Sequence, residues 1–347
     1  MNIIVPMAGL GKRMRPHTLT TAKPLLPIAG KPIVERLMED IVRVCDQPVQ
    51  RIAFVTAPSF GAAVERELLE IARKLGAEGS IHYQEQALGT AHAILCAESC
   101  LEGPVVVAFA DTLFQADFVL DSTQEGIIWV KRVEDPRAFG VVELHAEGWI
   151  GAFHEKPVEF ISDLAIIGIY YFRDGANLRH ELQYLIQNNI TDKGEYQLTS
   201  ALENMKAKGL RFFPGTVTEW LDCGNKNATV HTNSRYLEYL TLRNQEVLVH
   251  PDTVLIESTV VAPCYIGPGC RLVNARIGPY VSLGQGVQLE NSICESSIVR
   301  DGAQVSNINL RNALVGQHAR IAGNTEGNPT APLLELSISD YSEILCP

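Results

Sequence analysis

Three cations follow a pair of glycines near the start of the chain. Gly9 and Gly11 bracket a single residue, Lys12 and Arg13 come directly after them, and Arg15 follows Met14. Glycines let backbone amides approach an anion without a Cβ in the way, and neighbouring cations add charge-assisted contacts. The positive charge is local, because the whole chain has a formal net charge of -11. These residue types at this spacing predict a binding loop for a polyphosphate.

Two well-known phosphate loops do not match this stretch. A Walker loop needs a hydroxyl residue after its lysine, where this chain has Arg13, and a dinucleotide fingerprint needs a third glycine, where it has Met14. The stretch instead resembles the signature of the sugar-nucleotide pyrophosphorylases, which join a nucleoside triphosphate to a sugar 1-phosphate. The resemblance rests on Gly9-Leu10-Gly11-Lys12-Arg13-Met14, Pro16, Thr18, Lys23-Pro24, Leu26-Pro27 and Lys31-Pro32.

The resemblance implies roles for the residues of this loop. Arg13 and Lys23 would support the charge that develops on phosphorus. Leu10 and Lys12 depart from the commonest family pattern, which has glycine and threonine there. Leu10 keeps its backbone amide, so we expect an altered loop stiffness rather than a lost function. The nucleotide contacts would come from Ala8, Gly9, Leu10, Gly11 and Lys12.

A glutamine and a glycine five residues apart form a second candidate site. The side-chain amide of Gln84 can donate and accept at once, as pairing with the imide edge of uracil or thymine requires, and Gly89 lets a backbone group come close. A surface glutamine before a glycine-capped turn is the alternative. The stretch resembles the base-recognition segment of the pyrimidine-using family members, with Thr90 beside it. We therefore expect dTTP or UTP as the triphosphate.

Two aspartates are candidate ligands for Mg²⁺, which uses one or two protein carboxylates and takes its other ligands from phosphates and water. Asp111 ends a predicted strand, where an aspartate could also cap a helix. Asp222 stands in a Trp-x-Asp-x-Gly segment that resembles the one holding the second metal-binding acid of the family. We expect both carboxylates to hold one magnesium ion.

The sugar site is implied by resemblance to further family segments. Gly140 and Glu155 would contact sugar hydroxyls, while Lys156 would act on the phosphate of the sugar and Thr199 would contact it as well. Ser200 and Asp163 replace the aspartate and asparagine that the family commonly has there. The expected acceptor is glucose 1-phosphate, with N-acetylglucosamine and galactose 1-phosphates left open.

Alternating strand and helix patterns must position these residues. The predicted strands are 3–5, 51–56, 81–83, 105–110 and 165–172. Pro32 is expected to open a first helix, and two further helices are predicted over 62–75 and 90–100. Repeated βαβ units imply a mostly parallel, Rossmann-like sheet of the α/β class, which binds ligands beyond the carboxyl ends of its strands. The basic loop, Gln84 and Asp111 would all lie at that edge.

The pattern of apolar residues along the chain changes near residue 247. Aliphatic residues then recur at hexad spacing with turn glycines between them, a pattern typical of a parallel β-helix. We expect a helix over 228–244 to cap it. Family members carry a left-handed β-helix of this type, so the expected domains are 1–245, the nucleotidyltransferase, and 246–347. The aliphatic positions are Val254, Val260, Ile266, Leu272, Ile277, Leu283, Ile293, Val299, Val305, Val315 and Ile321.

Composition narrows the class of partner. The acidic balance argues against a nucleic-acid partner, and no stretch of about 18 apolar residues would span a membrane. The eight cysteines contain no Cys-x-x-Cys pair, so we expect free thiols in a cytoplasmic protein. The partners would be a nucleoside triphosphate, a sugar 1-phosphate and a second copy of the chain, with self-association through the β-helix.

Two other classes of function can be compared with the sequence. An acyltransferase on the β-helix would need a catalytic histidine, and His318 is the single histidine after His250. Such a histidine is more often a turn residue. A non-catalytic regulatory homologue would lack a loop arginine or a metal carboxylate, and this chain has Arg13, Asp111 and Asp222.

Overall fold

A computed structural model describes residues 1–9, 11–116, 119–324 and 330–346. By contact density the chain divides into two compact units. One unit is Met1–Gly9 with Leu37–Trp220, and the other is Leu10–Arg36 with Leu221–Pro347. The expected domain boundary after residue 245 stays a prediction, because this division follows contacts within the folded chain rather than independent folding.

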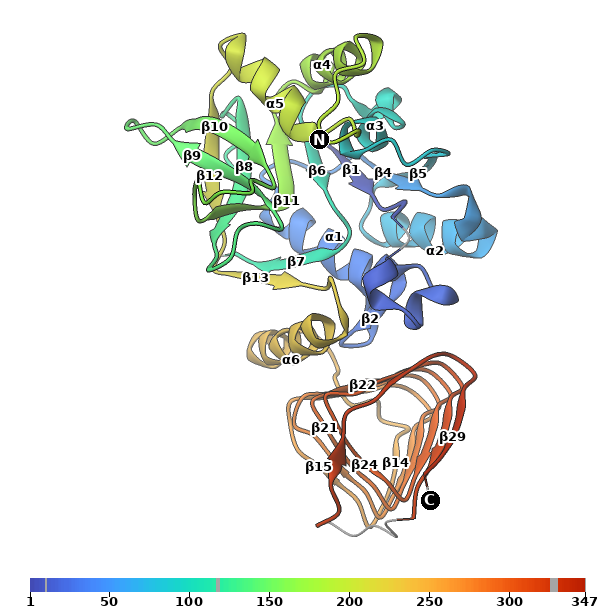
Figure 1. Cartoon of the computed structure of the whole chain (residues 1–347). Helices are drawn as coiled ribbons and strands as arrows, with labels where there is room; N and C mark the ends of the chain where they lie inside the picture. The colour runs from blue at the N-terminus through green and yellow to red at the C-terminus, as the bar shows by residue number, and fades with distance from the viewer. Residues whose placement is uncertain (10, 117–118, 325–329, 347) are drawn as a thin grey trace. The chain divides into compact units, whose positions relative to one another are not determined.

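A nine-stranded mixed sheet forms the centre of the first unit (Figure 1). Its order is β10-β9-β11-β6-β1-β4-β5, and β8 pairs with β11 and β12. The strands are β1 (Asn2–Pro6), β4 (Arg51–Thr56), β5 (Glu78–Tyr83), β6 (Val105–Ala108), β8 (Gly126–Arg132), β9 (Gly140–Leu144), β10 (Ile150–Glu155), β11 (Leu164–Phe172) and β12 (Phe212–Thr216). Further short strands are β7 (Thr112–Gln115) and β13 (Glu219–Asp222).

The four strands at one side of the sheet are parallel, as the βαβ pattern predicts. β1 pairs with both β4 and β6, and β4 pairs with β5. β11 runs antiparallel to β6, so the sheet is mixed beyond this point. The helices of the chain are α1 (Ile33–Val44), α2 (Gly61–Lys74), α3 (Thr90–Leu95), α4 (Gly175–Gln187), α5 (Leu198–Ala207) and α6 (Lys226–Arg243).

Alternate strand residues bury the two faces of this sheet. Ile4, Val55 and Val107 share a core with Ile94 of α3 and Leu182 of α4. The strand residues that point to the other face are equally buried, namely Ile3, Val5, Ile52, Phe54 and Val106. Because successive strand side chains alternate between faces, continuous apolar runs are what a sheet covered on both faces requires.

Two elements end earlier than their patterns predict. The helix expected over 90–100 stops at Leu95, and Ala97 has φ -100° and ψ 34°, outside the helical region. Beyond the end of the helix, the carbonyl of Cys100 accepts a hydrogen bond from the side chain of Asn2 at 3.0 Å. The strand expected over 105–110 stops at Ala108, because the amide of Phe109 bonds to Gly168 at an irregularity of β11.

A left-handed parallel β-helix makes up most of the second unit, and Figure 1 shows its stacked triangular coils. Three parallel sheets form its sides: β14-β17-β20-β23-β26-β29, β15-β18-β21-β24-β27 and β16-β19-β22-β25-β28. The inward residues Leu272, Leu289, Val305 and Ile321 stack directly on one another. Their buried column replaces the core that a single coil could not form.

The strands of the β-helix are two or three residues long. They are β14 (Val254–Ile256), β15 (Thr259–Val260), β16 (Cys264–Ile266), β17 (Arg271–Val273), β18 (Arg276–Ile277), β19 (Val281–Leu283), β20 (Gln288–Glu290), β21 (Ile293–Glu295), β22 (Ser297–Val299), β23 (Gln304–Ser306), β24 (Asn309–Arg311), β25 (Leu314–Val315), β26 (Arg320–Ala322), β27 (Leu333–Leu334), β28 (Ser337–Ile338) and β29 (Glu343–Leu345).

Two inward positions differ from the hexad expectation. Leu255, not Val254, pairs with the buried Leu272 of the next coil. Cys294, not Ile293, stacks on Ile277 and is fully buried. Residues that stack on successive coils, such as Leu289 and Val305, are separated by one or two residues fewer than three full hexads. A strict six-residue count therefore drifts out of register with the coils.

An asparagine ladder closes one row of turns. Asn274, Asn291 and Asn307 have φ of 45°, 47° and 54°, the left-handed region that asparagine tolerates. Asn274 Nδ2 donates to Asn291 Oδ1 at 2.8 Å, and Asn291 Nδ2 donates to Asn307 Oδ1 at 3.0 Å. Each amide thus ties its coil to the next.

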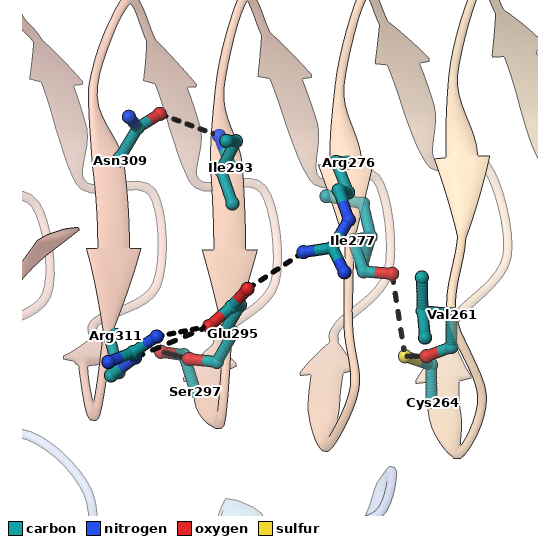
Figure 2. Close-up of polar contacts among 9 residues, drawn as sticks. All are labelled: Val261, Cys264, Arg276, Ile277, Ile293, Glu295, Ser297, Asn309 and Arg311. Atoms are coloured by element: carbon teal, nitrogen blue, oxygen red, sulfur yellow. Dashed lines mark hydrogen bonds and ion pairs between the residues drawn. The ribbon is translucent and has the colours of Figure 1, made fainter. Parts of the chain in front are cut away.

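The outer face of the β15 sheet carries an ion-pair ladder (Figure 2). Glu295 accepts from Arg276 at 2.7 Å and from Arg311 at 2.8 Å, and the hydrogen bond from Arg311 helps to lower the pKa of Glu295. Exposed pairs of this kind contribute little individually. The ion pairs therefore help to align neighbouring coils, whose stacking is already stabilised by buried residues and backbone pairing.

α6 covers a side of the β-helix and does not cap its end. It packs against β19 and β22, and Asn233 Oδ1 accepts from Ser282 Oγ at 2.7 Å. Val254, Leu255 and Ile256 of the first coil stay between 40% and 47% exposed. The expectation of an end cap was wrong because the buried face of α6 presents polar groups that match a hydroxyl of a lateral sheet.

The basic segment (residues 11–36) belongs to this second unit. Arg36 is buried, donates to the carbonyl of Ala29 at 2.6 Å and forms an ion pair with Glu246 at 2.8 Å. The Ala29 amide donates to Asn233 at 2.9 Å. Short elements shape the segment: 3-10 turns at Lys12–Met14, His17–Leu19 and Lys23–Leu25, and a hairpin of β2 (Pro27–Ile28) and β3 (Lys31–Pro32).

His17 fastens the basic segment to the β-helix. It is fully buried, and its Nε2 lies 3.0 Å from Ser337 Oγ. Burial, reinforced by the charges of Arg300 and Lys226 and opposed by Asp340, lowers the pKa of His17 from 6.5 to about 4. His17 is therefore neutral in the folded protein at neutral pH.

The cysteines and the helices bear on two of the expectations from composition. All eight cysteines are free, as predicted from their spacing. Among the described helices, none combines the length and the apolar character that crossing a bilayer requires.

Replacing Asn291 by alanine should lower the free energy of unfolding by about 2 kcal/mol, because it removes ladder hydrogen bonds and forces alanine into the left-handed region. Asn291→Gly should cost roughly half as much, since glycine adopts this φ without strain. Urea unfolding followed by circular dichroism measures both. Gln288→Ala, an exposed change in the same coil, is the control. Equal losses in the two Asn291 variants would show that backbone strain plays no part.

Acid should destabilise the protein through His17. Its folded pKa lies below its unfolded value, so the unfolded state binds more protons as pH falls from about 6.5 to about 4. Stability present at neutral pH should decline across this window, by roughly 3 kcal/mol at most from this group. His17→Gln, which cannot titrate, should show a flatter pH dependence in urea unfolding between about pH 7 and about pH 4.5. Identical slopes would contradict the assignment.

Candidate functional site

Parallel register brings three predicted site segments to one edge of the first unit. β1 leads into Ala8 and Gly9, β5 into Gln84, and β6 toward Asp111. β1 is the direct neighbour of β6, and β4 separates it from β5. The amide of Gln84 extends the pairing by donating to Thr56 at 2.9 Å. Gln84 and the Asp111 segment therefore follow the carboxyl ends of parallel strands, as the βαβ pattern predicts. The cations of the basic loop belong to the second unit, so their approach to this edge stays a prediction.

The 84–90 segment folds around its own glutamine. Gln84 Nε2 donates to the carbonyl of Gly89 at 3.1 Å and lies 3.2 Å from His92 Nδ1. Gly89 has φ 117°, and a Cβ there would lie 2.4 Å from the carbonyl oxygen of Tyr196. Only glycine fits this close approach, so the Gln-to-Gly spacing has a steric cause as well as a chemical use.

A second segment, residues 193–199, joins the first by backbone pairing. The Tyr196 amide donates to Leu88 at 2.8 Å, and the Ala91 amide donates to Tyr196 at 2.9 Å. Thr90 Oγ1 accepts from the amide of Leu198 at 2.9 Å. Thr90 therefore starts α3 and at the same time fixes the start of α5. We call segments 84–90 and 193–199 together the paired wall.

Three predicted sugar-site residues meet beside this wall. Gly140 and Glu155 are directly opposite each other on β9 and β10. Thr199 Oγ1 donates to Glu155 Oε2 at 3.2 Å. A Cβ on Gly140 would lie 3.3 Å from Glu155 Oε2 and 3.6 Å from Thr199 Cγ2, so the glycine keeps the space above the carboxylate narrow but open. Residues far apart in sequence thus form one small polar cluster.

Two lysines lie near Glu155, one beside its carboxylate and the other on backbone carbonyls. Lys156 Nζ lies 3.3 Å from Glu155 Oε1, and its side chain is 54% exposed. Lys193 Nζ donates to the carbonyls of Glu155 at 3.1 Å and Lys156 at 3.0 Å. Such a pair of cations beside a carboxylate suits a ligand that carries both hydroxyls and a phosphate.

Sequence reasoning missed Lys193, Gln197 and Tyr170. Lys193 directly precedes Gly194 and Glu195, and a cation beside this turn-forming pair was the available signal. Gln197 is 6% exposed and accepts from Thr90 Oγ1 at 3.1 Å. Tyr170 is buried, and burial together with the charge of Glu155 raises its pKa. No local pattern marks the last two residues, because their partners are distant in sequence.

The basic segment in the second unit is shaped by Gly11. Gly11 has φ 57°, and its carbonyl accepts from Thr18 Oγ1 at 2.9 Å. A Cβ on Gly11 would lie 2.9 Å from Lys23 Cβ, so glycine is required where the two ends of the turn touch. Lys12 and Arg13 are exposed, whereas Lys23 is 8% exposed. Leu10, also predicted to bind nucleotide, lies outside the described residues.

The two candidate metal carboxylates are both half-buried. Asp222 ends β13, its carbonyl accepts from Thr232 Oγ1 at 2.7 Å, and a Cβ on Gly224 would lie 2.8 Å from its carboxylate. Asp111 belongs to the first unit and Asp222 to the second, so their sharing one ion stays a prediction. In the described part of the chain no group of three or more His, Cys, Asp or Glu could hold a metal. Carboxylate oxygens are the donors that Mg²⁺ prefers, and it needs one or two of them from protein.

His318 is a turn residue of the β-helix. It has φ 54° and stacks on Tyr341 with ring centroids 5.2 Å apart. A Cβ on Gly302 of the neighbouring coil would lie 2.3 Å from His318 Nδ1, so the ring packs over that glycine. These contacts give His318 a packing role and lend no support to acyl transfer.

Comparisons with known proteins agree with this arrangement. The family model for nucleotidyl transferase matches residues 3–239. Glucose-1-phosphate thymidylyltransferase of Streptomyces griseus is 30% identical over 347 residues, which cover 94% of this chain and 95% of that protein. The enzyme of the same name from Streptomyces antibioticus is 27% identical, with 92% and 93% covered.

The fold has solved counterparts as well. UDP-glucose pyrophosphorylase solved with UDP-glucose superposes with a TM-score of 0.56 at 24% identity, covering 69% of this chain and 98% of that one. The likeness in fold and the similarity along nearly the full length of the relatives point the same way. The chain therefore belongs to the nucleotidyl transferase family and is a nucleotidyltransferase of the sugar-nucleotide class.

Proposed function

We propose that the protein transfers a nucleotidyl group from dTTP or UTP to a sugar 1-phosphate, releasing pyrophosphate. Glucose 1-phosphate is the proposed acceptor. The observation that carries the proposal is the paired wall, which joins the Gln84–Gly89 segment to Thr199 and, through it, to Glu155. A base-reading segment and a hydroxyl-reading cluster are thereby held at a fixed spacing, as joining a nucleotide to a sugar requires.

The nucleotide half of the proposal rests on Gln84 and Gly89. The amide of Gln84 is oriented by its bond to the Gly89 carbonyl at 3.1 Å, which lowers the entropy lost when a base pairs with this segment. An imide edge presents one donor between two acceptors, and a side-chain amide with a neighbouring backbone can match it. The names of the two Streptomyces relatives support dTTP.

The sugar half rests on Glu155 and Thr199. A carboxylate accepts from sugar hydroxyls, and its bond to Thr199 at 3.2 Å fixes its orientation. Lys156 and Lys193 would pair with the phosphate of the sugar, since both lie beside the same turn. Their charge would also hold the sugar phosphate as the attacking nucleophile.

The proposed reaction is an in-line displacement. A phosphate oxygen of the sugar 1-phosphate attacks the α-phosphorus, the bond from the α-phosphorus to the bridging oxygen breaks, and pyrophosphate leaves. Arg13 and Lys23 support the charge on the phosphoryl oxygens. Asp111 and Asp222 are the carboxylates that would hold Mg²⁺, which neutralises triphosphate charge when bound. No covalent enzyme intermediate is required.

Pyrophosphate release over a grid of dTTP, UTP, ATP and GTP against glucose, galactose, N-acetylglucosamine and mannose 1-phosphates tests the function. Pyrimidine triphosphates should be better by at least about tenfold. Arg13→Ala should lower kcat by roughly 10²-fold. Arg73→Ala, an exposed arginine of α2 paired with Glu70, is the control and should not alter kcat. Equal rates with GTP, or full turnover in Arg13→Ala, would reject the proposal.

Thr199→Val should raise KM for the sugar 1-phosphate, because it removes the hydroxyl that orients the Glu155 carboxylate and keeps the side-chain volume. We expect about a tenfold increase, the size of one lost hydrogen bond to a charged group. KM for the triphosphate should change less than about twofold. Thr199→Ser is the matched variant that keeps the hydroxyl. A rise in both Michaelis constants by the same factor would place Thr199 outside the sugar site.

A further inference from the structure

A buried ion pair of the β-helix lies against the basic segment. Arg300 follows β22 and Asp340 belongs to the last coil, and their side chains are 3% and 2% exposed. Arg300 Nη1 donates to Asp340 Oδ1 at 2.8 Å. The amide of Gln317 donates to the same oxygen at 2.8 Å. Stacked coils thus hold the pair rigidly.

Both members of this pair also form hydrogen bonds with the basic segment. Arg300 Nη2 lies 2.9 Å from Thr21 Oγ1, to which it donates, and Thr20 Oγ1 donates to Asp340 Oδ2 at 2.6 Å. His17 adds a third attachment through Ser337. Residues 17–21 lie in sequence between Arg13 and Lys23, the two cations assigned to the triphosphate.

The attachment extends to the glycine turn. Thr18 Oγ1 donates to the carbonyl of Gly11 at 2.9 Å, and Gly11 lies so near Lys23 that a Cβ on it would be 2.9 Å from Lys23 Cβ. Residues 17–21 are therefore bonded to the β-helix on one side and to the turn that bears Arg13 on the other. Fixing residues 17–21 fixes the separation of the two cations.

Stability alone does not account for such a pair. Desolvating two charges is costly, and replacing a buried pair by apolar residues is often neutral or stabilising. Arg300 Nε also has no hydrogen-bond partner among the residues that the structure describes. What a charged pair adds is direction, because its fork of donors and its carboxylate each hold one threonine hydroxyl in place.

We propose that Arg300 and Asp340 are positioning residues for nucleotidyl transfer. They hold Thr20 and Thr21 so that Arg13 and Lys23 meet the triphosphate in a fixed geometry. The inference rests on the proposed function for the role of these cations. It also makes the last coils of the β-helix part of the transferase machinery, in addition to the self-association expected of the β-helix.

The first test removes the threonine hydroxyls and leaves the ion pair in place. In Thr20→Val/Thr21→Val, amide hydrogen exchange of residues 11–25 without substrates should become faster than in the parent protein. kcat should fall by at least about tenfold, the effect of displaced catalytic groups. KM for the sugar 1-phosphate should stay within about twofold, since Glu155 and Thr199 belong to the first unit. Thr20→Ser/Thr21→Ser keeps both hydroxyls and should restore both measurements.

The second test replaces the pair itself. Arg300→Met/Asp340→Leu avoids an uncompensated buried charge, so the protein should still fold. It should reproduce the faster exchange and the lower kcat of the valine variant. Arg311→Met is the matched control, because this arginine of the same β-helix pairs with Glu295 on an outer face. It should match the parent protein in both measurements.

The outcomes separate this inference from the proposed function. Unchanged exchange in the valine variant would overturn the inference, and so would faster exchange with an unaltered kcat. If the parent protein showed no transferase activity while exchange still became faster, the anchoring would be supported and its catalytic purpose would be overturned together with the proposed function.

Discussion

Parallel strand register is the constraint on which both units depend. In the first unit, β1, β4, β5 and β6 point the same way, so the residues that follow them share one edge. In the second unit, the same register stacks Leu272, Leu289 and Val305 into one buried column. A slip by one residue would turn every side chain of a strand to the opposite face. Register therefore decides the core and the chemistry at once.

Glycines and asparagines determine where the chain can turn at the ends of these strands. Gly11 and Gly89 stand where a Cβ would collide with Lys23 or with the backbone of Tyr196. Asn274 and Asn291 adopt the left-handed turns that short coils need, and their amides bond along the stack. The same backbone requirement thus serves a binding loop in one place and a structural ladder in the other.

Charge is used differently on the surface and inside. The Glu295 ladder is exposed and supplies register at small energetic gain. The Arg300–Asp340 pair is buried, where breaking one partner would leave an uncompensated charge. His17 beside them stays neutral because its protonated form would have to be desolvated near Arg300. The hydrogen bonds that join the basic segment to the β-helix therefore fix the orientation of that segment as well as stabilising it.

The local features of this protein follow from its amino-acid sequence. Strand and helix patterns, the glycine-bracketed cations and the hexad repeat identified the parallel strands, the basic loop and the β-helix, because each follows from neighbours along the chain. Features that join distant residues emerge only when the chain is folded. The bond from Thr199 to Glu155, the position of Lys193 and the contacts of Arg300 with Thr21 each connect segments far apart in sequence. Side-chain periodicity records which face of an element is buried, but not which distant residue lies against it, and so these contacts could not be predicted.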